Sequence, residues 1–198
     1  MRALFFVSAL VLVSGLAVAS CTPSEEPTPS PTAVETTAST TPVESPSPTP
    51  TTVDPQTANI QAAKQTVLDY TADFNAVSQA GFVDGEATMF RYWGTPELME
   101  TYGTYFQMQL AAGARSEGEV VIASITALEY IENPSSTSHH QVRLEFCEDT
   151  SASTNLNRDG SVVEKDLPLR FMYEALMQLQ DDGRWTINAL EGYPERIC

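Results

Sequence analysis

The chain has 198 residues, of which 26 are Asp or Glu and 10 are Lys or Arg, and its formal net charge is −16 at pH 7. This excess of negative charge repels phosphate backbones and anionic lipid headgroups, which argues against nucleic acid or a bare membrane surface as a partner. The length suffices for one ordinary domain with its own hydrophobic core.

The N-terminal segment has the pattern of a signal peptide. One positive charge at Arg2 precedes a nearly continuous apolar run over residues 3–17. About 15 apolar residues suit the hydrophobic region of a signal peptide, and they are short of the ~20 that a membrane-spanning helix needs. The small residues Ala19 and Ser20 follow, as a processing peptidase requires. We therefore predict a signal peptide over residues 1–20.

The string Val18-Ala19-Ser20-Cys21 resembles the lipobox of bacterial lipoproteins. The resemblance implies that the Cys21 thiol receives a diacylglyceryl group, that the chain is cut before Cys21, and that the new amino terminus is open to acylation, for example with palmitate. Two acyl chains hold a protein stably on a membrane, whereas one chain binds only marginally. We expect a lipid-anchored protein at the cell membrane that faces the extracytoplasmic side. The alternative is an ordinary secretory signal followed by an incidental cysteine.

Residues 21–55 are predicted to form a disordered linker that begins with the lipidated Cys21. The segment consists of Thr, Pro, Ser and Glu with hardly a large apolar side chain, so it buries too little surface to offset the entropy of ordering. Its prolines favour extended polyproline II structure, which reaches on the order of 100 Å over this length. Its many hydroxyl groups are candidates for glycosylation. The folded domain is therefore expected over residues 56–198.

Three helices are expected in the first half of this domain. Residues 56–81 carry apolar side chains at spacings of three and four, which predicts a helix of about six turns. A short helix is expected over residues 84–94, with Asp84 at its N-cap. The third helix is expected over residues 95–113, where Thr95 supplies a capping hydroxyl before a proline.

The second half of the domain has the alternation that is typical of strands. A long strand is expected over residues 120–131, with apolar side chains on both parities. One parity carries Val120, Ile122, Leu128 and Tyr130, and the other carries Ile125, Ala127 and Ile131. Helices followed by antiparallel strands indicate an α+β fold in which the helices cover one face of a curved sheet.

Further strands are expected where apolar and polar residues alternate over residues 141–149, 167–179 and 184–191. In the last of them, the side chains of Trp185, Ile187 and Ala189 are expected to point the same way. Asp159 and Gly160 indicate a tight hairpin turn between two short arms. The basic residues Arg143 and Arg170 are expected to form cross-strand ion pairs with Glu145 and Glu174.

The cysteine count supports an extracytoplasmic location. Of the three cysteines, Cys21 is assigned to lipid. This leaves Cys147 and Cys198 as an even pair in an extracytoplasmic space, where disulfides persist. We predict that these two form a disulfide. The alternatives are two free thiols or a metal pair, and neither a CxxC spacing nor a nearby histidine supports zinc.

Several strings in their order resemble the NTF2-like (SnoaL/ketosteroid-isomerase-like) superfamily, and in particular its uncharacterised extracytoplasmic lipoproteins. The strings are Val142-Arg143-Leu144-Glu145-Phe146-Cys147-Glu148-Asp149, Asn157-Arg158-Asp159-Gly160-Ser161-Val162-Val163, Phe171-Met172-Tyr173-Glu174-Ala175 and Asp182-Gly183-Arg184-Trp185. The resemblance covers about residues 56–198 and implies a cone of helices and bent antiparallel sheet around a pocket. It implies no single function, because the same cone hosts isomerases, cyclases and non-catalytic binding or assembly domains.

No catalytic constellation stands out in the sequence. An enzyme of this fold needs a general acid or base inside the cone, and the candidates are Tyr70, Asp73, Tyr102, Tyr105, His139 and His140. Packed tyrosines, a solvated aspartate and an exposed strand start explain these residues better than catalysis does, so we assign no catalytic residue. No metal ligand set and no cofactor motif is present, and neither a metal nor a cofactor is expected.

Pocket-lining side chains are expected on the inner stripes of the first and third helices. They are Tyr70, Phe74, Tyr102, Tyr105 and Phe106. Three functions are open at this point. A non-catalytic domain that binds a small ligand or a protein partner fits the absence of catalytic residues best. A small pocket enzyme of isomerase or cyclase type and a structural module that forms a homodimer are the alternatives.

Overall fold

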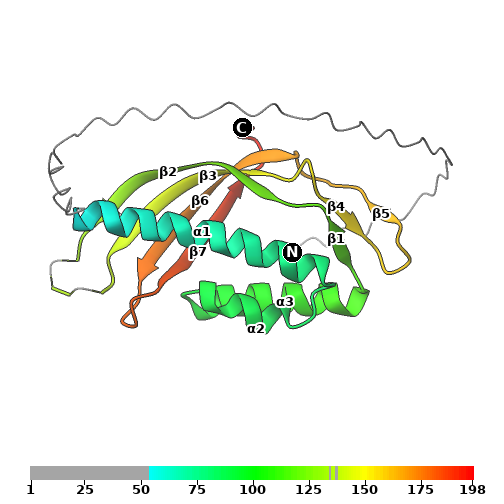
Figure 1. Ribbon diagram of the computed structural model, residues 1–198, viewed down its shortest axis with the longest axis horizontal. Coiled ribbons are helices and arrows are strands. Elements are labelled where there is room, and N and C mark those ends of the chain that lie inside the picture. Colours follow the sequence, from blue (N-terminus) through cyan, green and yellow to red (C-terminus); the bar gives the residue numbers. More distant parts are fainter. Residues whose placement is uncertain (1–53, 134, 137) are drawn as a thin grey trace, which may run out of the picture. The chain divides into compact units, whose positions relative to one another are not determined.

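The computed structural model describes residues 54–133, 135–136 and 138–198, which belong to one compact unit over Thr49–Cys198. The predicted signal peptide, Cys21 and the predicted linker up to residue 53 lie outside the described residues. Three α-helices in this part of the chain pack on one face of an antiparallel sheet (Figure 1). The α+β architecture expected from the sequence is confirmed. None of the helices described is both long and apolar enough to span a membrane.

The first helix, α1, spans Pro55–Gln79 and begins one residue before the expected domain start. The carboxylate of Asp54 accepts a hydrogen bond from the backbone N–H of Thr57 at 3.0 Å, and Pro55 occupies the first turn, where its missing N–H costs nothing. Ala63, Val67 and Thr71 are buried at intervals of four, so one face of α1 packs on the rest of the domain.

Two short elements and a second long helix follow. They are α2 (Gly85–Met89), the 3-10 turn η1 (Phe90–Tyr92) and α3 (Pro96–Ala112). The Thr95 hydroxyl accepts from the backbone N–H of Leu98, as expected, and α3 ends at Gly113, whose φ of 67° suits glycine. Asp84 stands at the N-cap of α2, but its backbone is left-handed at φ 54° and its side chain makes no capping hydrogen bond. The expected N-cap position of Asp84 is confirmed, but its side chain does not cap the helix.

The main sheet has the order β2-β3-β6-β7, and every neighbouring pair is antiparallel. Its strands are β2 (Val121–Ile131), β3 (Gln141–Asp149), β6 (Arg170–Leu179) and β7 (Trp185–Tyr193). A smaller sheet, β1-β4-β5, consists of Arg115–Glu117, Thr154–Leu156 and Val162–Val163. The expected turn at Gly160 joins the short arms β4 and β5.

In β2 and β7, the side chains that face the core differ from those expected from simple alternation. Register shifts in β2 between Ile122 and Ser124 and between Ala127 and Glu129 each change the parity of the inward residues. The partly buried residues of β2 are Ile122, Ile125, Ala127 and Tyr130, whereas Leu128 is 49% exposed. A register shift between β6 and β7 likewise leaves Ala189 exposed and turns Leu190 inward, so Ala189 does not share a face with Ile187.

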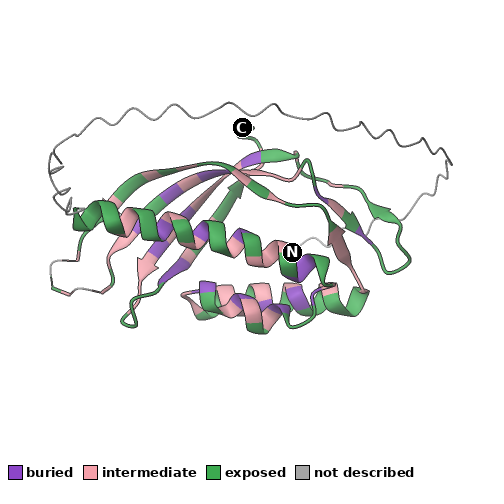
Figure 2. Cartoon of the chain, in the orientation of Figure 1, coloured by how far each residue is buried: buried purple, intermediate pink, exposed green. Residues whose placement is uncertain are grey.

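The core lies between the helices and the inner face of the sheet (Figure 2). Trp93, Phe106 and Met89 come from the helical half and are almost completely buried, and they meet Leu144 and Met177 from the sheet. The indole of Trp93 stacks on Tyr102 with ring centroids 4.1 Å apart, and its Nε1–H is the buried polar atom that lacks a hydrogen-bond partner in the described part of the chain.

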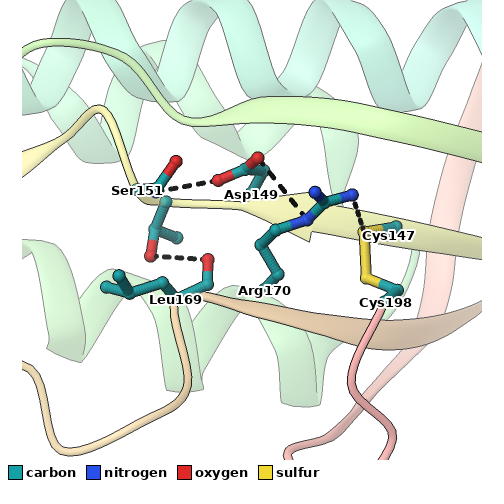
Figure 3. Close-up of a disulfide and its surroundings, with 7 residues drawn as sticks. Cys147, Asp149, Ser151, Leu169, Arg170 and Cys198 are labelled. Atoms are coloured by element: carbon teal, nitrogen blue, oxygen red, sulfur yellow. Dashed lines mark hydrogen bonds and ion pairs between the residues drawn. A yellow bond between two sulfur atoms is a disulfide. The ribbon is translucent and has the colours of Figure 1, made fainter.

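The C-terminal tail is held against the outer face of the sheet. The sulfur atoms of Cys147 and Cys198 are 2.01 Å apart, the distance of a disulfide bond (Figure 3). Arg196 donates hydrogen bonds to the carboxylates of Glu145 and Glu174. The tail therefore meets the sheet through the disulfide, two ion pairs, and a backbone hydrogen bond from the N–H of Met172 to the carbonyl of Arg196.

Arg143 and Arg170 form cross-strand ion pairs, but the partners expected for them are wrong. Arg143 lies 4.0 Å from Glu129, and Arg170 lies 3.5 Å from Asp149, as Figure 3 shows for the second pair. Glu145 and Glu174, the expected partners, instead bind Arg196. Strand alternation does not predict this pairing, because it depends on where the C-terminal tail lies on the sheet.

Candidate functional site

A cavity of about 180 Å³ lies between α1, α3 and the inner face of the main sheet. Its wall is mostly aromatic. The aromatic side chains are Tyr70 and Phe74 from α1, Tyr102 and Tyr105 from α3, Phe146 from β3 and Tyr173 from β6. The remaining described residues of the wall are Thr71, Val120, Leu190 and one acidic side chain, Glu148 of β3.

The structure brings four of the five sequence-predicted pocket residues together. Tyr70, Phe74, Tyr102 and Tyr105 line this cavity. Phe106 does not, because it follows Tyr105 on α3 and points into the core, where it is 1% exposed. Its ring lies 5.5 Å from that of Tyr105, so it supports the wall from behind.

Glu148 was not singled out from the sequence. It follows Val142, Leu144 and Phe146 at even spacing, so it stands on the inner, apolar face of β3. An acid at the end of an alternating apolar series was therefore visible as a signal. The sequence alone did not show that the inner face at this point borders a cavity.

The environment of Glu148 disfavours its ionised form. Burial raises the pKa of its carboxyl from an ordinary 4.5 to about 7, and the positive charge of Lys165 opposes this shift in part. Lys165 does not line the cavity. Its ammonium group donates to the backbone carbonyls of Thr150 and Ser153 and to the Ser153 hydroxyl. Glu148 thus has a nearby positive charge but no direct ion pair with it.

Thr71 lines the cavity too, and its hydroxyl donates to the backbone carbonyl of Val67, but the carboxyl and phenol groups of the wall lack partners within the described residues. Neither the carboxylate of Glu148 nor the hydroxyls of Tyr70, Tyr102, Tyr105 and Tyr173 take part in a hydrogen bond with another described group. Burial is the main cause that raises the pKa of each of these tyrosines, and the charge of Glu148 raises it further. The phenols are therefore neutral hydrogen-bond donors at neutral pH.

The other candidate residues lie away from this cavity. Asp73 accepts a hydrogen bond from the hydroxyl of Tyr92 at 2.5 Å and pairs with Arg91, so its side chain is held within the domain and is only partly exposed. His140 stacks on Tyr130 at 5.8 Å, and its Nδ1 accepts from the backbone N–H of Asn133. His139 has a positive φ of 66° at the turn before β3. None of the three lines the cavity.

A second, wider hollow of about 540 Å³ lies beside Asp73, Arg91 and Arg184. Its charged groups are largely occupied, because Arg91 binds Asp73, Arg184 binds the adjacent Asp182, and Asp69 accepts a hydrogen bond from Gln65. It therefore offers a ligand fewer free groups than the aromatic cavity does. Within the described residues, His, Cys, Asp and Glu nowhere gather in threes as a metal site would need.

No protein-family model and no curated protein matches the sequence. Among solved structures, the chain is similar to a periplasmic fragment of TraM at 8% identity and a TM-score of 0.45, covering 68% of this chain and 98% of that fragment. It is also similar to a ketosteroid isomerase-like protein from Erwinia carotovora atroseptica at 15% identity and a TM-score of 0.34, covering 67% of this chain and 92% of that protein.

A third similar structure is a mutant of the helical cell shape determining protein Pgp2 from Campylobacter jejuni. It is 11% identical with a TM-score of 0.32, and the match covers 68% of this chain and 39% of that one. These likenesses carry no argument about activity. The chain's own elements show an α+β fold, in which three helices cover the inner face of an antiparallel sheet and enclose a cavity with it.

Proposed function

We propose that this protein is an extracytoplasmic lipoprotein whose NTF2-like domain binds a small ligand in the aromatic cavity without converting it. The observation that carries the proposal is the free carboxylate of Glu148 among tyrosine hydroxyls that have no partner in the described part of the chain. Polar groups in an apolar wall are normally satisfied, and those that are not mark where a ligand or water completes the bonds.

Two observations support the extracytoplasmic location. The signal-peptide pattern and the lipobox string that ends at Cys21 precede the domain in the sequence. Cys147 and Cys198 lie at disulfide distance, and disulfides persist outside the reducing cytosol. The lipid anchor would hold the binding domain at the cell membrane.

The anchor is tested by mass spectrometry and membrane fractionation of the wild type and Cys21→Ala. We expect the wild type to carry a diacylglyceryl-sized mass and to sediment with membranes, and we expect Cys21→Ala to lose both. Ser20→Ala is the control, because it keeps a small residue before the cysteine and should leave the modification intact. Membrane retention of Cys21→Ala at the wild-type level would contradict the lipid assignment.

Ligand binding is tested by a two-dimensional NMR screen of small polar and aromatic compounds. Leu190→Trp should abolish the chemical-shift changes, because Leu190 lines the cavity and a larger side chain fills it. Ala189→Trp is the matched control, since the neighbouring residue is exposed and should leave binding unchanged. Shift changes that persist in Leu190→Trp would place any binding elsewhere.

A second candidate function is acid–base catalysis of the isomerase type. It is favoured by one observation, which is that a carboxyl group with a pKa of about 7 takes up and releases protons at neutral pH. Incubation of cavity-binding ketones in D₂O tests it. Exchange of protons next to the carbonyl that disappears in Glu148→Gln would favour the enzyme, and the absence of exchange would favour binding alone.

A further inference from the structure

We propose that the cavity takes a small organic cation, whose ammonium group lies between the tyrosine rings and the carboxylate of Glu148. This inference rests on the proposed binding function and names the chemical class of its ligand. Three observations carry it. They are the aromatic side chains around the cavity, the Glu148 carboxylate in its wall that pairs with no described group, and the net charge of the whole chain.

The aromatic wall offers the surface that ammonium groups prefer. Tyr70, Tyr102, Tyr105 and Tyr173 come from three different elements and converge on one cavity. The face of an aromatic ring carries partial negative charge, and it attracts a desolvated cation within about 6 Å of its centre. Several rings around one site act together, as in aromatic cages that bind quaternary ammonium groups.

Glu148 supplies the counter-charge. Its carboxylate accepts no hydrogen bond from a described group, so a ligand that neutralises it displaces no protein partner. The charged or titratable groups that act on it are Lys165 and the cavity tyrosines. The ammonium group of Lys165 is occupied by three oxygen acceptors of Thr150 and Ser153, so it lowers the pKa of Glu148 without filling the cavity.

The whole chain favours a cation over an anion. With a formal net charge of −16, the protein raises the local concentration of positive ligands and lowers that of negative ones. The cavity of about 180 Å³ is smaller than the roughly 300–1,000 Å³ of sites for drug-sized ligands, so the cation must be small. A compact alkylammonium compound meets both conditions.

The experiment compares three probes of nearly the same shape by NMR titration of the full chain. Choline carries a quaternary ammonium group, 3,3-dimethylbutan-1-ol is its neutral isostere, and 3,3-dimethylbutanoate carries a negative charge. We expect choline to shift the signals of the cavity residues and to bind at least tenfold more tightly than the alcohol. The carboxylate should not bind.

The variant Glu148→Gln keeps the side-chain shape and removes the charge. It should weaken the binding of choline at least tenfold and leave the affinity for the alcohol unchanged. Glu129→Gln is the control, since Glu129 lies on the exposed side of β2 and pairs with Arg143. Wild-type affinity for choline should rise about tenfold from pH 6 to pH 8 as Glu148 ionises, and that of Glu148→Gln should stay constant.

The outcomes separate this inference from the binding function on which it rests. Equal binding of choline and the alcohol, or binding of the carboxylate alone, overturns the cation inference and leaves a ligand-binding cavity. Cavity shifts from choline that survive Glu148→Gln at full strength also overturn it. If neither these probes nor a broad neutral and anionic panel shifts the cavity signals, the binding function itself is overturned.

Discussion

Cys147 and Glu148 are consecutive residues of β3 that face opposite sides of the main sheet. Cys147 lies on the outer face, where it meets Cys198 of the tail and the guanidinium of Arg170 (Figure 3). Glu148 lies on the inner face and lines the cavity. Two neighbouring positions of β3 therefore carry the C-terminal disulfide on one face of the sheet and the candidate binding site on the other.

The disulfide should contribute strongly to stability. It joins residues 51 positions apart, and for a loop of that size the chain-entropy model gives roughly 4 kcal/mol. Cys198→Ser should lower the free energy of unfolding by about that amount, measured by chemical denaturation without reductant. Addition of reductant to the wild type should reproduce the loss, and it should leave Cys198→Ser unchanged. Equal stability of the two proteins under oxidising conditions would contradict the bond.

Arg196 should contribute less to stability than the disulfide at Cys198 does. Its guanidinium pairs with Glu145 and Glu174, but all three side chains reach solvent, where ion pairs contribute little. Arg196→Ala should lower the melting temperature by a small amount, and high salt should reduce the difference further. Arg196→Lys keeps the charge and serves as the control. A loss as large as that of Cys198→Ser would show that the ion pairs, rather than the disulfide, hold the tail.

The pH dependence of stability should carry the signature of Glu148. Its pKa is about 7 in the folded state against 4.5 ordinarily, so the folded state binds more protons than the unfolded state between these values. The contribution of Glu148 to the free energy of unfolding is fully present below about pH 4.5 and is lost as the pH rises through about 7. The full shift corresponds to roughly 3 kcal/mol.

Glu148→Gln removes this titration and tests it. We expect the variant to be more stable than the wild type at pH 8, by up to about 3 kcal/mol, and to show a flatter profile between pH 5 and pH 8. Denaturant titrations at several pH values measure this, with Glu129→Gln as the variant that should follow the wild type. An identical slope in Glu148→Gln and the wild type would mean that the carboxyl is not shifted.

Gly94 should tolerate no side chain. It lies where the chain between η1 and α3 meets β7, and its N–H donates to the carbonyl of Ile187 at 2.9 Å. A Cβ atom there would come within 1.9 Å of the Asn188 side chain and 2.5 Å of the Thr186 hydroxyl. Gly94→Ala should therefore cost about 1–3 kcal/mol of stability through overpacking.

Gly103 provides the matched control for this prediction. A Cβ atom on Gly103, inside α3, meets its nearest neighbour on Phe90 at 3.4 Å, which is a normal contact. Gly103→Ala should be neutral or stabilising by up to about 1 kcal/mol, because alanine favours the helix. Thermal denaturation of both variants tests the pair, and a reversed order would contradict the packing described for Gly94.

The sequence determined the local elements. The starts of α1 and α3 follow from a proline in the first turn behind an N-cap side chain, Asp54 and Thr95. The stripes of the helices and the alternation in β3 follow from short-range periodicity. The class of fold follows from the order of these elements. The predicted lipid anchor and homodimer stay predictions.

Only the tertiary structure decided which side chains meet. Bulges in β2 and the register shift in β7 turned Leu128 and Ala189 outward, because one extra residue exchanges the two faces of a strand. Arg196 reached Glu145 because a covalent bond brings the tail to the sheet. Glu148 stood on the apolar face of β3 by parity alone, but its charge became significant only where α1 and α3 bring tyrosines to the same cavity. Local interactions select helix or strand, whereas a binding site needs contacts between residues far apart in the chain.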